Sequence, residues 1–150
     1  MFKLNIETAQ VVEIVCLLYL LVLSVQDIRR HAVSVRFLAA GAVLAVTAQL
    51  VWKEQTFLMC AAGMTAGLLF VGLSRLTEEG IGYGDSILIT ILGFYIGAKN
   101  LLYLLGIAFA IAAVFSVCML AASRWNKKTS FPFIPFITAG YIVLLILRMI

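Results

Sequence analysis

Six apolar segments separated by short polar gaps run along the chain, and this pattern constrains the fold more than any other feature of the sequence. A helix that crosses a bilayer needs about 20 residues, with a range of about 17–25. Most of the segments approach or reach this length, and none shows the strict alternation of a membrane-spanning strand. We therefore expect an all-α integral membrane protein, a bundle of about six transmembrane helices. The segments cover residues 10–26, 36–52, 57–73, 85–98, 101–122 and 132–149.

The composition excludes a water-soluble globular domain. Residues of the set AVILMFWYC make up 64% of the 150 residues, and charged residues only 12%. Soluble domains are typically about 45–50% apolar and about 25% charged, so this chain has too few charged side chains to cover its apolar surface. The lipid bilayer is therefore an expected partner, and the length favours a single membrane-embedded domain over residues 1–150.

The basic residues indicate how the bundle is oriented. The gaps after the first, third and fifth segments hold seven Lys and Arg residues, and the opposite side holds four. Because the side richer in Lys and Arg stays in the cytoplasm, we expect these gaps to be cytoplasmic and both termini to lie outside. The gaps are too short to form a nucleic-acid-binding surface, so no nucleic-acid partner is expected. The seven residues are Arg29, Arg30, Arg36, Arg75, Arg124, Lys127 and Lys128.

The sequence offers no ligands for a metal site and no disulfide framework. Cys16, Cys60 and Cys118 each lie alone within an apolar segment, and their spacing matches neither a zinc site nor paired disulfides. The only histidine, His31, follows two arginines at the end of a segment. We expect the cysteines to pack as small apolar residues, and we expect no metal and no cofactor.

The two aspartates are the strongest candidates for chemistry. Asp27 ends the first apolar segment and Asp85 opens the fourth, and the chain has no other aspartate. The expected orientation places both at the cytoplasmic face. Ionisable residues at membrane depth are costly and suggest function. Two carboxyl groups close together in a low dielectric tend to share one proton, so the ionised group can activate water while the protonated group polarises a carbonyl.

A structural role for both aspartates stays open on charge placement alone. Asp85 fits a helix N-cap, and Asp27 fits an ion pair with the arginines that follow it. The residues before Asp85 favour a functional role, because Gly82 and Gly84 leave no side chain between the carboxyl group and an approaching peptide. We therefore expect Gly82 and Gly84 to contribute to substrate binding.

Two further local patterns are typical of close packing and of a turn. Gly63 and Gly67 form a GxxxG pattern, whose small residues allow helix backbones to approach closely. We favour packing within the chain, although the same pattern also allows a homo-oligomer interface. Residues 132–136 read Pro-Phe-Ile-Pro-Phe and contain the only prolines. On these residues alone the pattern indicates a turn that starts a helix.

Together these motifs resemble those of a known family. Residues 82–85, Gly-Tyr-Gly-Asp, resemble the GxGD motif of intramembrane-type aspartic proteases. An aspartate followed by basic residues at the end of the first segment resembles one branch, the type IV prepilin leader peptidases. The glycines at the end of the fourth segment and the Pro-Phe-Ile-Pro-Phe turn before the sixth resemble the same branch.

The resemblance implies a specific activity and site. Asp27 and Asp85 would be the catalytic pair of an aspartic endopeptidase that cleaves the leader of prepilin-like or pseudopilin proteins. The reaction would occur at the cytoplasmic face of a bacterial or archaeal cell (inner) membrane. Larger relatives carry an additional domain with CxxC motifs that methylates the product, and this sequence contains no such motif. We therefore expect the peptidase activity without the methyltransferase.

The sequence departs from the family pattern at two places. Many members have a proline shortly after the first aspartate, where residues 32–35 here read Ala-Val-Ser-Val, and many have a lysine at the position of Ile87. A relative that binds prepilins without cleaving them therefore stays open. So does a small transport or assembly subunit whose aspartates bind an ion. Coupling ions lie near the bilayer midplane, whereas both aspartates are at segment ends, which favours the peptidase.

Overall fold

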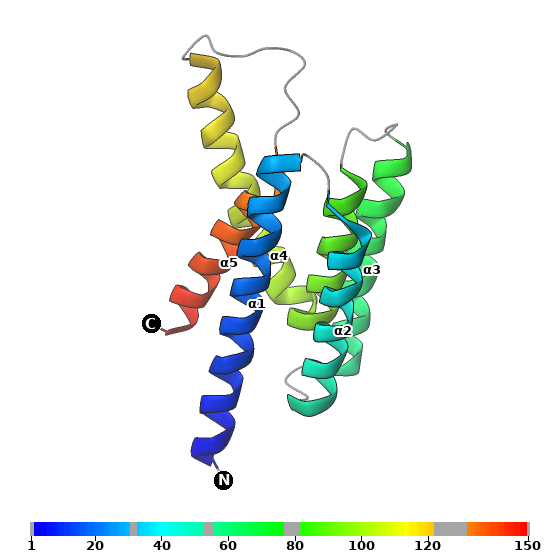
Figure 1. Ribbon diagram of the computed structural model, residues 1–150, viewed down its shortest axis with the longest axis vertical. Helices are drawn as coiled ribbons and strands as arrows, with labels where there is room; N and C mark the ends of the chain where they lie inside the picture. The colour runs from blue at the N-terminus through cyan, green and yellow to red at the C-terminus, as the bar shows by residue number, and fades with distance from the viewer. Residues whose placement is uncertain (1, 31–32, 53–55, 77–81, 122–131, 150) are drawn as a thin grey trace.

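Five α-helices and no strand make up the part of the chain that the structure describes. A computed structural model of the protein describes residues 2–30, 33–52, 56–76, 82–121 and 132–149. The expected all-α fold is confirmed within these ranges (Figure 1). The helices are α1 (Phe2–Arg30), α2 (Val35–Trp52), α3 (Phe57–Leu76), α4 (Tyr83–Ala121) and α5 (Ile134–Met149).

Three of the helices contain stretches that are long and apolar enough to cross a membrane, namely Gln10–Arg30 in α1, Phe57–Leu76 and Tyr83–Ala121. α2 and α5 contribute the shorter apolar stretches Val35–Leu50 and Ile134–Arg148. These lengths agree with a multi-pass membrane protein. The expectation of six separate spans remains a prediction, because the fourth and fifth predicted segments lie within the single element α4.

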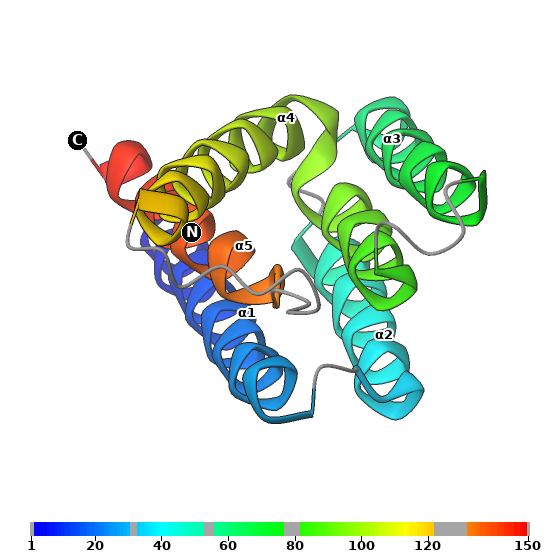
Figure 2. The same ribbon diagram turned by 90° about the horizontal axis from the view of Figure 1, so that it is seen from above.

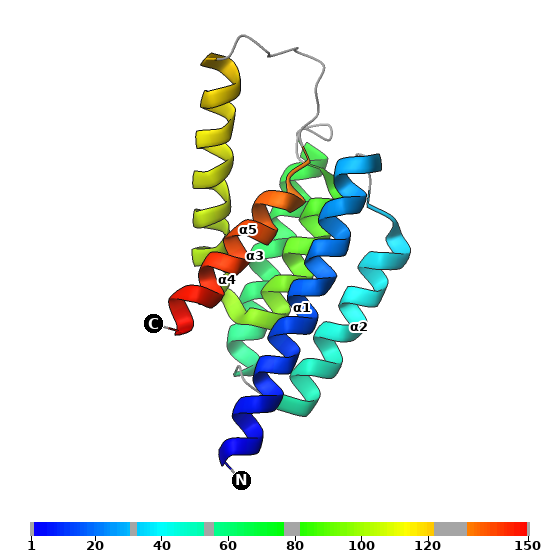
Figure 3. The same ribbon diagram turned by 60° about the vertical axis from the view of Figure 1, so that its left-hand side comes forward.

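α4 reverses its direction at Gly97, between these two predicted segments. Gly97 is buried and has φ 78° and ψ 162°, a backbone conformation that is essentially restricted to glycine. The Asn100 side chain donates to the carbonyl of Ile96 at 2.9 Å, which satisfies an acceptor at the end of the first limb. The first limb, residues 83–96, runs away from the end of the bundle that holds the last turn of α1. The second limb, residues 98–121, runs back toward that end (Figures 1 and 3).

The reversal divides the helices into two groups. Seen from above, α1, α5 and the second limb of α4 lie together on one side, and α2, α3 and the first limb lie on the other (Figure 2). Buried apolar side chains from both groups meet in one core. They include Leu20 and Leu23 of α1, Leu88 and Leu92 of the first limb, and Leu104 of the second limb. The core therefore holds the two groups together below the end of the bundle where α1 finishes.

Small residues set the distance between α3 and the first limb of α4. A Cβ at Gly63 would overlap the carbonyl of Gly93, and a Cβ at Gly67 would overlap the backbone of Thr90. The GxxxG pattern therefore packs within the chain, as expected. Since Gly63 faces Gly93 and Gly67 faces Thr90, the two helices run antiparallel in a fixed register.

Candidate active site

Asp27 lies in the last turns of α1 and is buried, with only 5% of its surface exposed. Its Oδ2 accepts a hydrogen bond from the backbone N–H of Ile134 at 3.3 Å. Ile134 is the first residue of α5, so the positive end of that helix points toward the carboxyl group. A buried carboxylate is thus held by a donor from the opposite end of the sequence.

The Pro-Phe-Ile-Pro-Phe turn explains why this donor is free to bind Asp27. The carbonyl of Phe133 accepts the N–H groups of Phe136 and Ile137 at 3.0 and 3.2 Å, which starts the helix as expected. Pro135 has no N–H, and the N–H of Ile134 has no acceptor inside its own helix. Asp27 supplies that acceptor, a contact that the sequence analysis did not predict. The two prolines around Ile134 were the only sequence signal for it.

Asp85 lies in the first turn of α4, close to the backbone of the preceding loop. The N–H of Ser86 donates to the carbonyl of Gly82 at 3.1 Å, so Gly82 is the last residue before the helix. Asp85 is therefore inside the helix rather than at its N-cap, in contrast to the structural role considered above. A Cβ at Gly82 would lie 2.8 Å from Oδ2 of Asp85, so any side chain at position 82 would displace the carboxyl group.

The fold brings the two aspartates together from separate helix groups. α1 ends and α4 begins at the same end of the bundle (Figure 1). Asp27 in the last turns of α1 and Asp85 in the first turn of α4 therefore lie at this same end of the bundle. Two carboxyl groups close together in a low dielectric cannot both ionise easily. The carboxyl groups of Asp27 and Asp85 can therefore share one proton.

Gly84 and Val33 close one side of this region. A Cβ at Gly84 would lie 3.3 Å from Cβ of Val33, which belongs to the short connection between α1 and α2. Val33 belongs to the stretch Ala-Val-Ser-Val, residues 32–35, at which the sequence analysis expects a departure from the family pattern. The departure noted in the sequence therefore lies directly beside the glycine motif.

Ser86 joins the start of α4 to α3 and was not singled out in the sequence. Its side chain is fully buried, and its Oγ is within hydrogen-bond distance of the carbonyls of Gly82 (3.2 Å) and Phe70 (3.3 Å). Because a hydroxyl has one proton, it donates to these two acceptors in alternation or as a shared bond. The contact holds the residue next to Asp85 against the neighbouring helix.

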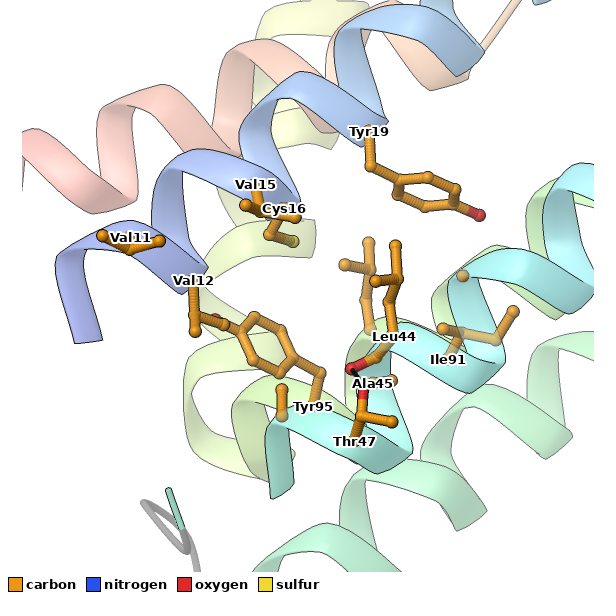
Figure 4. Close-up of a pocket in the computed structure, with 13 residues that line it drawn as sticks. Val11, Val12, Val15, Cys16, Tyr19, Leu44, Ala45, Thr47, Ile91 and Tyr95 are labelled. Atoms are coloured by element: carbon orange, nitrogen blue, oxygen red, sulfur yellow. Dashed lines mark hydrogen bonds between the residues drawn. The ribbon is translucent and has the colours of Figure 1, made fainter. Parts of the chain in front are cut away.

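A separate apolar pocket of about 330 Å³ lies between α1, α2 and the first limb of α4, and neither aspartate lines it (Figure 4). Tyr19 lies toward one end of this pocket, eight residues before Asp27, which is roughly 12 Å along the helix. Its hydroxyl donates to the carbonyl of Phe37 at 3.0 Å and links α1 to α2. The pocket is therefore distinct from the aspartate region.

In the part of the chain that the structure describes, no three His, Cys, Asp or Glu side chains lie close enough together to bind a metal ion. His31 falls outside the described residues. Cys16, Cys60 and Cys118 are not paired in disulfides, and they lie on three different helices.

Comparison with known proteins gives the family. No solved structure matches the chain significantly. A curated protein of Bacillus subtilis (strain 168), named "Prepilin leader peptidase/N-methyltransferase", is 27% identical over 143 residues. The alignment covers 95% of this chain but 57% of that relative, so the chain spans a little over half of the relative's length. The profile of the Type IV leader peptidase family matches residues 14–117, which include both aspartates and the glycine motif. The chain therefore belongs to the Type IV leader peptidase family.

Proposed function

We propose that the protein is a membrane aspartic endopeptidase that removes the leader peptide of prepilin-like proteins, with Asp27 and Asp85 as its catalytic pair. Membership of the leader peptidase family supports a protease that acts on leader peptides. The observation that carries the aspartic type is the position of the chain's only two aspartates, in α1 and α4, at one end of the bundle. The proposal concerns the peptidase activity alone.

The proposed reaction uses the pair as one acid and one base. The ionised aspartate takes a proton from a water molecule, whose oxygen attacks the carbonyl carbon of the scissile peptide bond. The protonated aspartate donates to the carbonyl oxygen and stabilises the negative charge that develops there. The C–N bond then breaks, and the proton taken from water passes to the departing amine.

The contacts of the two residues suggest which one is the base. The N–H of Ile134 donates to the Asp27 carboxyl group, and a donated hydrogen bond favours the charged form of its acceptor. No hydrogen bond to the Asp85 carboxyl group is found among the described residues, and Gly82 leaves it accessible. We assign Asp27 as the general base and Asp85 as the group that carries the proton.

The position of the pair supports a reaction at the membrane surface. Asp27 lies three residues before the end of α1 and Asp85 two residues after the start of α4, so both are near the ends of apolar helices. Arg29 and Arg30, which follow Asp27, are exposed. With the positive-inside rule, this end of the bundle is cytoplasmic. The substrate would present its leader there while its apolar helix stays in the bilayer of the cell (inner) membrane.

Co-expression with a prepilin-like substrate tests the proposal. We expect a tagged substrate with a basic leader and an apolar helix to be shortened in cells that contain this protein and to stay intact in cells that do not. Mass spectrometry of the product should find a single cut between the leader and the apolar helix. Several substrates that all remain uncut at normal membrane levels of the protein would contradict the peptidase function.

The hydrogen bond from Ile134 to Asp27 gives a second test. Replacing Ile134 with proline removes the N–H but keeps a residue that is accepted at the first position of a helix. Hydrogen bonds to charged groups contribute about 1.5–3 kcal/mol, so we expect Ile134→Pro to lower the cleavage rate about tenfold or more. The rate would be measured as initial cleavage of a purified substrate in detergent.

Ile134→Ala is the matched control for this variant. Ile134 is fully buried, and alanine removes more of its side chain than proline does while it keeps the N–H. We expect Ile134→Ala to cleave faster than Ile134→Pro at equal amounts of folded protein. Equal rates for the two variants would show that the N–H does not act on Asp27 during the reaction.

A further inference from the structure

An arc of phenylalanine rings lies beside the aspartates and is not explained by the catalytic pair. The Phe70 and Phe109 rings stack with centroids 6.3 Å apart, and the Phe109 and Phe133 centroids are 5.2 Å apart. These three rings, which we call the aromatic arc, come from α3, from the second limb of α4 and from the turn before α5. They therefore join the two helix groups on one side of the site.

Hydrogen bonds place the aromatic arc at the depth of the catalytic pair. The carbonyl of Phe70 lies 3.3 Å from Oγ of Ser86, the residue after Asp85. Phe133 precedes Ile134, whose N–H binds Asp27. Both ends of the arc are thus connected to a neighbour of an aspartate.

The register of α4 gives the same depth for the middle of the arc. Asp85 and Phe109 are each twelve residues from Gly97, on the two limbs that reverse there. Twelve helical residues rise roughly 18 Å, so the carboxyl group and the ring lie at similar distances from the reversal. The aspartates and the aromatic arc therefore belong to one layer of the bundle.

Phe70 and Phe133 are half-buried and pack against the core, and Phe109 is the open part of the arc. Phe109 is 46% exposed, although it contacts two other rings. Three residues earlier on the same face, Gly106 has open space where a Cβ would lie. Leu102, on the same face seven residues before Phe109, is 64% exposed. This face of the second limb offers an apolar surface with a small residue in the middle, against which another helix can pack closely.

We propose that Phe70, Phe109 and Phe133 form the subsite for the first apolar side chain that follows the scissile bond. The substrate's apolar helix then lies along Gly106 and Leu102 on the second limb of α4. This inference rests on the proposed function. The depth of the aromatic arc indicates which part of the substrate occupies it. When the scissile peptide bond lies at the aspartates, the next side chain of the substrate lies at the same depth in the bundle. The exposed surface at that depth is aromatic.

A pair of matched substrates tests the subsite. The two substrates differ only in the residue after the scissile bond, which is leucine in one and alanine in the other. We expect the wild-type protein to favour the leucine substrate about tenfold in kcat/KM, a typical value for an apolar side chain in a fitted pocket. In Phe109→Ala the preference should fall toward unity, mainly through a higher KM for the leucine substrate. A loss of folded protein would affect both substrates equally and leave the ratio unchanged.

Tyr103→Ala is the control for this variant. Tyr103 lies on the same limb, six residues before Phe109, and at 57% is similarly exposed. Six helical residues turn the side chain to a different face, so the preference for leucine should stay at the wild-type value. A Phe109→Ala protein that keeps the wild-type preference, or a Tyr103→Ala protein that loses it equally, would overturn the subsite.

Photo-crosslinking separates a failure of the subsite from a failure of the proposed function. Benzoylphenylalanine is placed at position 109 or at position 103 in the Asp85→Asn protein, with the leucine substrate as the probe. We expect more crosslinks from position 109 than from position 103, which is three residues before Gly106 and does not contact the aromatic arc. Crosslinks from 109 without any cleavage by the otherwise wild-type protein would support the subsite and contradict the peptidase. Cleavage with no crosslink from 109 would overturn the subsite alone.

Discussion

Asp27→Asn and Asp85→Asn are each expected to abolish leader cleavage while the protein stays at wild-type levels in the membrane. Asparagine has nearly the shape of aspartate but can neither take the proton of water nor deliver one to the carbonyl oxygen. General acid and base groups contribute about 10²–10⁴-fold to rates, so a single amide at either position should lower the rate by that factor. The measurement is the initial rate of leader removal from a purified substrate.

The double variant should be no slower than the slower of the two single variants. The two groups are proposed to act as one unit, and the effects of such groups are strongly non-additive. If the rate loss of the double variant equalled the product of the two single losses, each aspartate would act independently. The comparison therefore tests the pairing as well as the identity of the residues.

Glu13→Gln is a control for the removal of a carboxylate elsewhere in α1. Glu13 accepts a hydrogen bond from Arg148 at 3.0 Å, and the two side chains form a partly exposed ion pair between α1 and α5. The pair lies fourteen residues from Asp27 along α1, which is roughly 21 Å, and so is remote from the proposed site. We expect near wild-type cleavage. Cleavage that survives in either aspartate variant would contradict the assignment of that aspartate to the catalytic pair.

Gly97→Ala is expected to destabilise the protein, because the new side chain does not fit the backbone conformation at the reversal of α4. At φ 78° and ψ 162°, a side chain collides with the neighbouring backbone, and such strain costs about 1–3 kcal/mol. Because Gly97 is also buried, the reversal of α4 has little room to relax. We expect a lower midpoint of thermal unfolding in detergent and less folded protein in the membrane.

Gly72→Ala is the matched control for Gly97→Ala. Gly72 lies within α3, and a Cβ there would meet no atom within 4 Å. Alanine is the better helix former, by about 1 kcal/mol in water, so the control should be as stable as the wild type or slightly more stable. A Gly97→Ala protein as stable as Gly72→Ala would show that α4 does not need the glycine conformation at its reversal.

Local features of the sequence were sufficient to predict much of the fold. Long apolar segments cannot form strands in lipid or hide in a soluble core, because their backbone groups need partners and their side chains need an apolar environment. The break near residues 99–100 was expected from the polar residues there, and the structure has the reversal at Gly97. The glycines at positions 63 and 67 predicted close packing, and α4 provides the partner.

Other features could not be predicted because they depend on how separate helices meet. The Pro-Phe-Ile-Pro-Phe turn was expected to start a helix, and it does so, but its N–H at Ile134 also binds Asp27, 107 residues away in the sequence. The role of Ser86 likewise depends on the carbonyl of Phe70 in another helix. Nothing in the local pattern around either residue specifies such a partner.

The sequence by itself determined that the apolar segments form helices and that both aspartates lie at the ends of such segments. It also determined that glycines precede Asp85. These properties follow from composition and spacing, which act over a few residues at a time. Only the tertiary structure decided that Asp27 binds the start of α5, that Asp27 and Asp85 lie at one end of the bundle, and that the rings of Phe70, Phe109 and Phe133 meet. The physical reason is the reversal at Gly97. It turns the second limb of α4 back toward the end of the bundle where the first limb begins, so that residues far apart in the sequence lie at similar depths.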